Sequence, residues 1–131
     1  ERVENDGSLS VRAAKKKYMR KRPYVQFGEP TGVPADEEEL RKTGSFPSGH
    51  TARGWAMALV LAEINPERQD EILVRCYQYG ESRVIAGYHY HIDVDVARVA
   101  ASGAVARLHA DEGFRKQLEK AKKEFARLKK K

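Results

Sequence analysis

The segment from Thr51 to Ile64 is apolar on nearly every side of the helix that it is predicted to form. Such a helix is stable in water only when other elements cover it, so the segment predicts a buried helix. Asn65 and Pro66 end this helix, because proline cannot continue its hydrogen bonds. The longest apolar run, Ala56–Ala62, is too short for a membrane helix, which needs about 20 residues.

The rest of the chain also has helical character, and no segment has a convincing period-two strand pattern. Pro23 ends a first helix and Gly87 ends a later one. The helix after Gly87 is rich in small residues, which would let another helix approach closely, and the last helix is amphipathic. The predicted helices besides the buried one are Leu9–Lys21, Glu67–Ala86, His89–Ala110 and Phe114–Lys131.

Residues 24–47 are rich in proline and glycine and predict a long loop, with a short helical turn around Asp36–Lys42. Loops of this length in a compact domain are usually functional or mobile. The whole chain of 131 residues has the length of one domain. A single cysteine, Cys76, excludes an internal disulfide and leaves the redox compartment open.

The net charge of +6 is concentrated at the two ends of the chain. Residues 1–23 carry +5 and residues 115–131 carry +7, whereas residues 24–114 carry −6. A basic face could meet nucleic acid or an acidic lipid surface, but charge runs of this kind are usually solvated helix faces. Composition excludes collagen-like and low-complexity chains, since 40% of the residues are hydrophobic and 34% are charged.

The sequence Pro47-Ser48-Gly49-His50 stands where the long loop meets the buried helix. The start of a helix leaves backbone N–H groups unpaired and carries partial positive charge, so it suits an anion. Gly49 would let the backbone approach a ligand, and Ser48 could donate its hydroxyl. Ser48 as a plain N-cap is the alternative interpretation.

A second group of chemical residues follows Ser82-Arg83. His89 and Asp93 are four residues apart and are predicted to share one face of a helix. A carboxylate on one imidazole nitrogen selects the tautomer and leaves the other nitrogen free to attack or to accept a proton. His91 and Asp95 have the same spacing, and spacing alone does not choose between the two pairs.

Three basic residues could clamp an anion together with these groups. Arg83 and Arg22 offer planar forks that match phosphate oxygens, and Lys15 offers a point charge. A solvated side chain is the alternative for each of them. The neighbours Lys16 and Lys17 leave the register of Lys15 open.

Together these residues resemble the signature of the type 2 phosphatidic acid phosphatase superfamily, which reads K-x6-RP, PSGH and SR-x5-H-x3-D. Its register selects Lys15 over its neighbours and His89 over His91. Stretches outside the signature resemble the bacterial class A non-specific acid phosphatases; they include residues 17–20, 44–46, 58–63, 80–85 and 106–109 together with Trp55.

The resemblance implies an all-α helical bundle of the acid phosphatase/vanadium haloperoxidase type that lacks its N-terminal helices. Residues 1–131 would be one helical phosphatase domain, the C-terminal part of a longer family chain. Glu1 has the character of an internal position, so we expect a covering N-terminal segment or a homo-oligomer.

The resemblance also implies metal-independent hydrolysis of phosphomonoesters through a phosphohistidine, with no cofactor. His89 would be the nucleophile, Asp93 would orient it, and His50 would protonate the leaving group. The expected optimum is acidic to near neutral, with a bell-shaped profile. The phosphate-binding residues would be Lys15, Arg22, Ser48, Gly49 and Arg83, and no metal ligands are expected.

Expected partners are small phosphomonoesters and inorganic phosphate or vanadate, with neither nucleic acid nor a membrane span. The family relation implies a periplasmic or secreted location, although the chain carries no signal-peptide pattern. Three alternatives stay open: a vanadate-binding haloperoxidase-like protein, an inactive fragment of a phosphatase, and a basic nucleic-acid-binding module.

Overall fold

The computed structural model describes residues 2–130 as helices joined by turns and loops, with no strand in that range. The predicted all-α fold is therefore confirmed. The α-helices are α1 (Arg2–Tyr18), α2 (Pro23–Phe27), α3 (Glu37–Leu40), α4 (Gly49–Ile64), α5 (Gln69–Ile85), α6 (His91–Leu108) and α7 (Glu112–Lys129), and two 3-10 turns cover Pro34–Asp36 and Pro66–Arg68.

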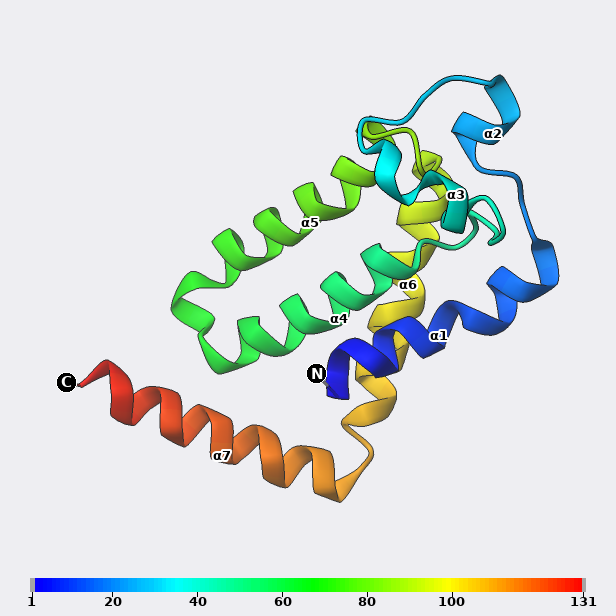
Figure 1. Cartoon of the computed structure of the whole chain (residues 1–131). Coiled ribbons are helices and arrows are strands. Elements are labelled where there is room, and N and C mark those ends of the chain that lie inside the picture. The colour runs from blue at the N-terminus through cyan, green and yellow to red at the C-terminus, as the bar shows by residue number, and fades with distance from the viewer. Residues whose placement is uncertain (1, 131) are drawn as a thin grey trace.

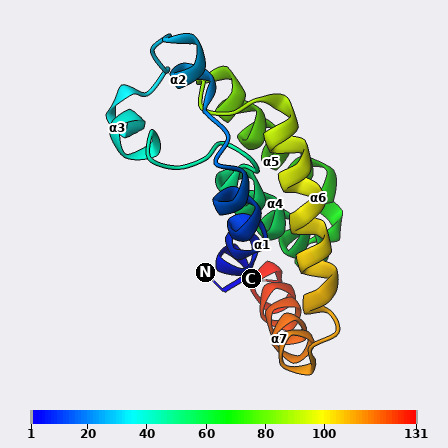
Figure 2. The ribbon, with the colours of Figure 1, turned by 90° about the vertical axis from the view of Figure 1, so that its right-hand side faces the viewer.

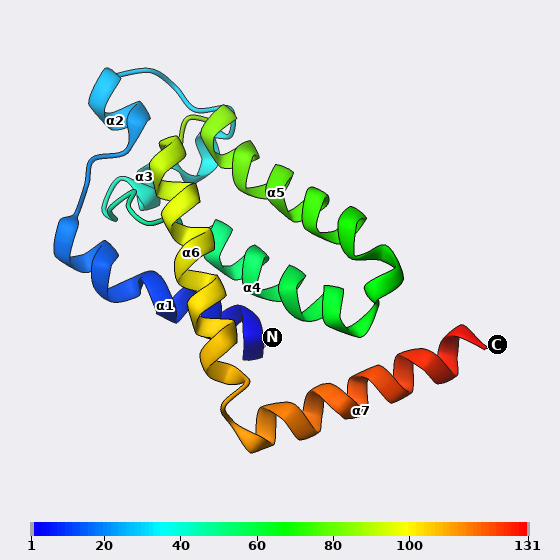
Figure 3. The ribbon, with the colours of Figure 1, turned by 180° about the vertical axis from the view of Figure 1, so that it is seen from behind.

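Helix α4 is the centre of the bundle, as its apolar surface predicts. Helices α1, α5 and α6 all pack along it (Figures 1 and 2). The amphipathic helix α7 follows α6 and runs past the far end of α4 (Figure 3). Within residues 2–130, no helix combines the length and the apolar character needed to cross a bilayer.

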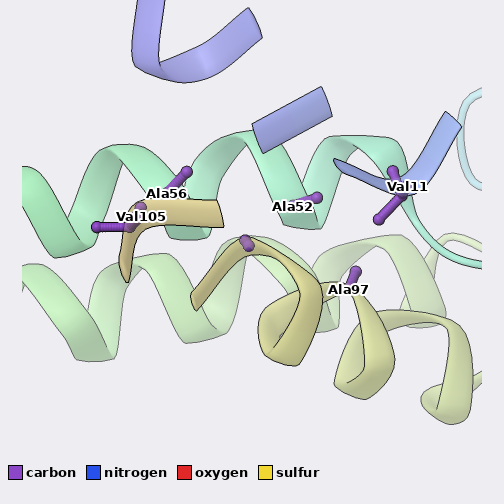
Figure 4. Packing of buried hydrophobic residues seen from close by; sticks show 6 residues of the cluster. Val11, Ala52, Ala56, Ala97 and Val105 are labelled. Atoms are coloured by element: carbon purple, nitrogen blue, oxygen red, sulfur yellow. The ribbon is translucent and has the colours of Figure 1, made fainter. Parts of the chain in front are cut away.

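Small side chains let the central helices approach one another closely. Ala52 and Ala56 of α4 form the core with Ala97 of α6 and Val11 of α1, and none of the four is more than 1% exposed (Figure 4). A Cβ on Gly7 of α1 would lie 2.7 Å from the carbonyl oxygen of Ala52. The α1–α4 crossing therefore depends on a residue without a side chain.

The predicted helix boundaries differ from the observed ones mainly at the starts. The first helix begins at Arg2 rather than Leu9, and the helix predicted from His89 begins at His91. Gly87 has a φ of +82°, a left-handed conformation that favours glycine and ends the preceding helix as expected. The predicted final residue of the last helix, Lys131, lies outside the described residues.

The long loop between α1 and α4 is tied to the end of α5. Tyr24 N donates a hydrogen bond to Gly87 O over 3.3 Å, and Gly32 N donates to Ala86 O over 3.0 Å. The helical turn predicted within this loop is confirmed by α3, and α2 and one 3-10 turn are additional elements. These bonds hold the loop over the ends of α5 and α6.

Adding one methyl group at Gly7 should destabilise the protein. Gly7→Ala places a Cβ against Ala52 O and 2.8 Å from Ala56 Cβ, so the helices must shift, at a cost of about 1–3 kcal/mol. The matched control is Gly103→Ala in α6, where a Cβ meets nothing within 4 Å and should stabilise the helix by about 0.5–1 kcal/mol. Urea unfolding measures the change in the free energy of unfolding for each variant. Equal changes in the two variants would contradict this packing.

Candidate active site

The candidate site residues meet at one end of the helical bundle. Helices α1 and α5 finish at this end, α4 and α6 begin there, and α2 and α3 lie beside them (Figures 1 and 3). Backbone hydrogen bonds join these ends: Ser48 N donates to Asp93 O over 2.9 Å, and His89 N donates to Arg83 O over 3.2 Å. Motifs that are far apart in the chain are therefore neighbours in space.

The imidazole of His89 is buried and contacted on both nitrogens. Its Nδ1 lies 3.4 Å from Asp93 Oδ2, and its Nε2 lies 3.3 Å from Arg22 Nη1. A carboxylate accepts and a guanidinium donates, so these contacts favour the neutral tautomer with the proton on Nδ1. Burial lowers the pKa of His89 to about 4, and the cations of Arg22 and Lys15 act in the same direction.

His89 and Asp93 do not share a helix face, which corrects the sequence interpretation. His89 lies in the loop before α6, and Asp93 is in the first turn of that helix. Asp93 Oδ2 also accepts a hydrogen bond from Tyr90 N over 2.9 Å, so this carboxylate caps the helix. The turn from Gly87 to Tyr90 brings the histidine back to the capping carboxylate, and the pair forms although one partner is not helical.

Arg22 and Lys15 are held in place by main-chain carbonyl groups. Arg22 is 4% exposed and donates to Leu40 O over 2.9 Å and to Tyr88 O over 3.2 Å. Lys15 Nζ donates to Gly44 O over 2.8 Å. Burial, and then the charge of Arg22, lower the pKa of Lys15 to about 8, so its ammonium is charged at acidic and neutral pH.

Arg83 carries donors that no group in the described part of the chain satisfies. Its Nε and Nη2 are buried and have no hydrogen-bond partner within residues 2–130. Its guanidinium carbon lies 4.5 Å from the centroid of the Tyr88 ring. An unsatisfied buried donor costs about 1–3 kcal/mol, so the guanidinium fits an anion that offers two acceptor oxygens.

The PSGH motif forms the loop-to-helix corner that its residues predict. Ser48 is the N-cap of α4, and its Oγ accepts from Thr51 N over 3.3 Å; this capping role uses the oxygen as an acceptor and leaves the hydroxyl hydrogen as a donor. A Cβ on Gly49 would lie 4.0 Å from Lys15 Cε, which places this backbone beside the ammonium stem. The pKa of His50 is lowered by burial and by the charges of Arg83, Arg53 and Arg22.

The two residues that the signature register excludes, His91 and Asp95, have partners elsewhere, and one residue near the site was missed. His91 is largely exposed and contacts Glu81, while Asp95 pairs with Arg98, so the rival pair lies apart from the site. Arg20 donates to Asp93 Oδ1 over 3.2 Å but is only an unspecified position of the K-x6-RP motif. No local signal pointed to it, because the sequence placed Arg20 within the predicted helix Leu9–Lys21 and its partner is remote in the chain.

Comparison with known proteins places this chain in a family. Residues 7–112 match the PAP2 superfamily. The chain therefore belongs to the PAP2 superfamily, and its all-α fold and signature residues agree with that membership.

Within the superfamily, the chain is similar to bacterial acid phosphatases. It is 60% identical over 128 residues to a non-specific acid phosphatase of Providencia stuartii, a match that covers 98% of this chain and 52% of that protein. It is 48% identical over 119 residues to a non-specific acid phosphatase of Salmonella typhimurium, covering 91% and 48%. An acid phosphatase of Zymomonas mobilis subsp. mobilis is 45% identical over 112 residues, covering 86% and 42%.

These similarities confirm the resemblance to non-specific acid phosphatases that the motifs indicated. The chain spans about half the length of these curated relatives. The activity of a whole protein of this kind is therefore a proposal for this chain.

Removing the unsatisfied guanidinium should weaken the binding of orthophosphate. Arg83→Met eliminates the buried donors Nε and Nη2, and the loss of charged hydrogen bonds worth about 1.5–3 kcal/mol should lower the affinity about 10- to 100-fold. Calorimetric titration with phosphate or vanadate at pH 6 measures the change. The control Arg107→Met removes the same charge from an exposed position of α6 and should bind as the parent does; equal affinities of all three proteins would exclude Arg83 from the anion site.

Proposed function

We propose that this chain hydrolyses phosphomonoesters through a phosphohistidine formed on His89. The observation that carries the proposal is the buried imidazole of His89, whose Nδ1 meets Asp93 and whose Nε2 faces the cations. A neutral imidazole with this orientation has its lone pair on Nε2 and directed toward Arg22, where a phosphate oxygen would bind. The similarity to acid phosphatases supports the same reaction.

In the first step, His89 Nε2 attacks phosphorus and the ester P–O bond breaks. His50 gives its proton to the departing alkoxide oxygen, so that an alcohol leaves. The Nδ1 proton stays on the imidazole, and the carboxylate of Asp93 stabilises the positive charge that develops on the ring. A phosphoryl group now occupies Nε2.

In the second step, His50 removes a proton from water as the water oxygen attacks phosphorus. The P–N bond breaks, phosphate leaves, and both histidines return to their starting states. Charge on the transferred group would be stabilised by the Lys15, Arg22 and Arg83 cations, the Ser48 hydroxyl and the Gly49 amide. All steps use groups of the protein, water and the substrate.

The substrates that we propose are small phosphomonoesters, with orthophosphate or vanadate as competing ligands. Export to the periplasm or the medium is part of the same proposal and rests on the family resemblance. Association with a second copy or with a further segment also stays a prediction. An apolar groove of about 450 Å³ between α4 and α5, which includes Met57, Leu61 and Ile72, supports it.

Replacement of the nucleophile should abolish turnover and the covalent intermediate together. His89→Ala removes the attacking nitrogen, and we expect hydrolysis of p-nitrophenyl phosphate to fall at least about 10³-fold. Labelled substrate quenched in alkali, where phosphohistidine survives, should leave label on the parent protein and none on the variant.

The matched control is His91→Ala, which changes an exposed residue two positions away. This variant should keep both the turnover of p-nitrophenyl phosphate and the label on the protein. Turnover by His89→Ala at the parent rate would refute the assignment of the nucleophile. A parent chain that binds vanadate but oxidises halide instead of hydrolysing phosphomonoesters would favour the haloperoxidase-like alternative, and one that does neither would favour the inactive fragment.

The pH profile of kcat/KM should be bell-shaped with an acidic optimum. His89 must be neutral to attack, so the rate should rise as pH increases through its pKa of about 4. His50 must be protonated, and its pKa in the free protein lies below the ordinary value of 6.5, so the rate should fall again before neutrality. Steady-state rates between pH 3 and 9 test this, and a rate that still rises at pH 9 would contradict the assignment.

A further inference from the structure

The guanidinium of Arg20 lies against the His89–Asp93 pair, although Arg20 is only an unspecified position of the K-x6-RP motif. Its Nη1 donates a hydrogen bond to Asp93 Oδ1 over 3.2 Å. Its guanidinium carbon lies 4.0 Å from the centroid of the Tyr90 ring. Because the planar group is both stacked on a ring and bonded to a carboxylate, its position is more restricted than that of a solvated arginine.

The two oxygens of Asp93 have different partners. Oδ2 faces His89 Nδ1 over 3.4 Å and accepts from Tyr90 N over 2.9 Å, while Oδ1 accepts from Arg20. Rotation of the carboxylate about its Cβ–Cγ bond would disrupt contacts on both oxygens. Asp93 is fully buried and the side chain of Arg20 is 42% exposed, so this arginine connects the buried charge to the surface.

The backbone between α1 and α2 places two arginines along the His89–Asp93 pair. Ser45 N donates to Arg20 O over 2.8 Å and holds the segment, and Arg22 is extended with φ −72° and ψ 154°. Side chains two residues apart in an extended segment lie on the same side. Arg22 accordingly reaches His89 Nε2, and Arg20 reaches the far oxygen of Asp93.

We propose that Arg20 is a positioning residue for the nucleophile. It holds the Asp93 carboxylate in the orientation in which Oδ2 accepts the Nδ1 proton of His89, and it thereby keeps Nε2 of His89 unprotonated and aimed at phosphorus. The role rests on the proposed function, because it is a role in the attack by His89. Arg20 acts through Asp93 and does not touch the substrate.

Loss of Arg20 has two physical consequences for His89. The carboxylate of Asp93 loses its charged partner on Oδ1 and keeps its hydrogen bonds with Tyr90 N and the Ser45 side chain, so it holds the Nδ1 proton of His89 less strictly. A positive charge beside the pair also disappears, which favours the imidazolium and raises the pKa of His89. Lys15 and Arg22, the two cations that lower the pKa of His89, stay in place.

Steady-state hydrolysis of p-nitrophenyl phosphate tests the role in catalysis. In Arg20→Gln we expect kcat to fall about 10- to 100-fold, as for other residues that orient a reacting group, while KM changes less than about threefold. Arg20→Lys should recover part of kcat, because an ammonium can still donate to Oδ1. The matched control is Lys21→Gln, which removes the same charge from the next, exposed residue and should leave kcat unchanged.

Nitrogen-15 NMR of His89 in the ligand-free protein provides a readout that does not need activity. In the parent protein and in Lys21→Gln we expect the Nδ1–H tautomer; in Arg20→Gln we expect a mixture of tautomers and a higher pKa. Asp93→Asn removes the group through which Arg20 acts. Arg20→Gln should therefore change the tautomer and kcat much less in that background than in the parent.

The outcomes separate this proposal from the proposed function. Parent-like tautomer and pKa of His89 in Arg20→Gln would overturn the positioning role, whether or not the chain is active. A rise in KM at constant kcat would also overturn it and would make Arg20 a phosphate ligand. A parent chain without phosphatase activity would refute the proposed function, while the NMR comparison would still decide whether Arg20 orients the His89–Asp93 pair.

Discussion

The buried carboxylate of Asp93 connects the helix ends around the site. It caps α6 through Tyr90 N, its main-chain carbonyl accepts from Ser48 N at the start of α4, and its oxygens meet His89 and Arg20. A buried charge is stable only when hydrogen bonds and opposite charges compensate for lost hydration. Burial raises the pKa of Asp93, but bonds from His89 and Tyr90 outweigh it, so the group is ionised. The interactions that stabilise this charge also orient the imidazole.

The cations around the imidazole show a second constraint on the site. Arg22 and Lys15 are bonded to carbonyl groups of the folded loop, so their positions are set before any ligand arrives. Arg83 differs, because two of its buried donors lack partners among the described residues. Burial, and then the charges of nearby arginines, lower the pKa of His50; an anion would relieve both the repulsion between the cations and the missing hydrogen bonds. This arrangement supports the proposed binding of phosphate.

Prediction from the sequence succeeded where local pattern and tertiary packing agree. The apolar surface of 51–64 identified the central helix, and the small residues after Gly87 identified the close contact that Ala97 makes with α4. The prediction failed at His89, where the i, i+4 spacing from Asp93 suggested that both residues share one helix face. A loop residue and a carboxylate that caps the following helix can have the same spacing. Arg20 was missed because its partner lies 73 residues away in the chain.

The sequence by itself determined the helical class and the buried central helix, because periodicity, proline and glycine act over a few neighbouring residues. Its resemblance to a known signature selected the candidate site residues. Only the tertiary structure decided how the two histidines are surrounded, which oxygen of Asp93 meets which partner, and which donors of Arg83 are unsatisfied. Hydrogen bonds, burial and charge interactions depend on distances of a few ångströms between segments remote in the chain. Such distances arise only when α1, α5 and α6 have packed around α4.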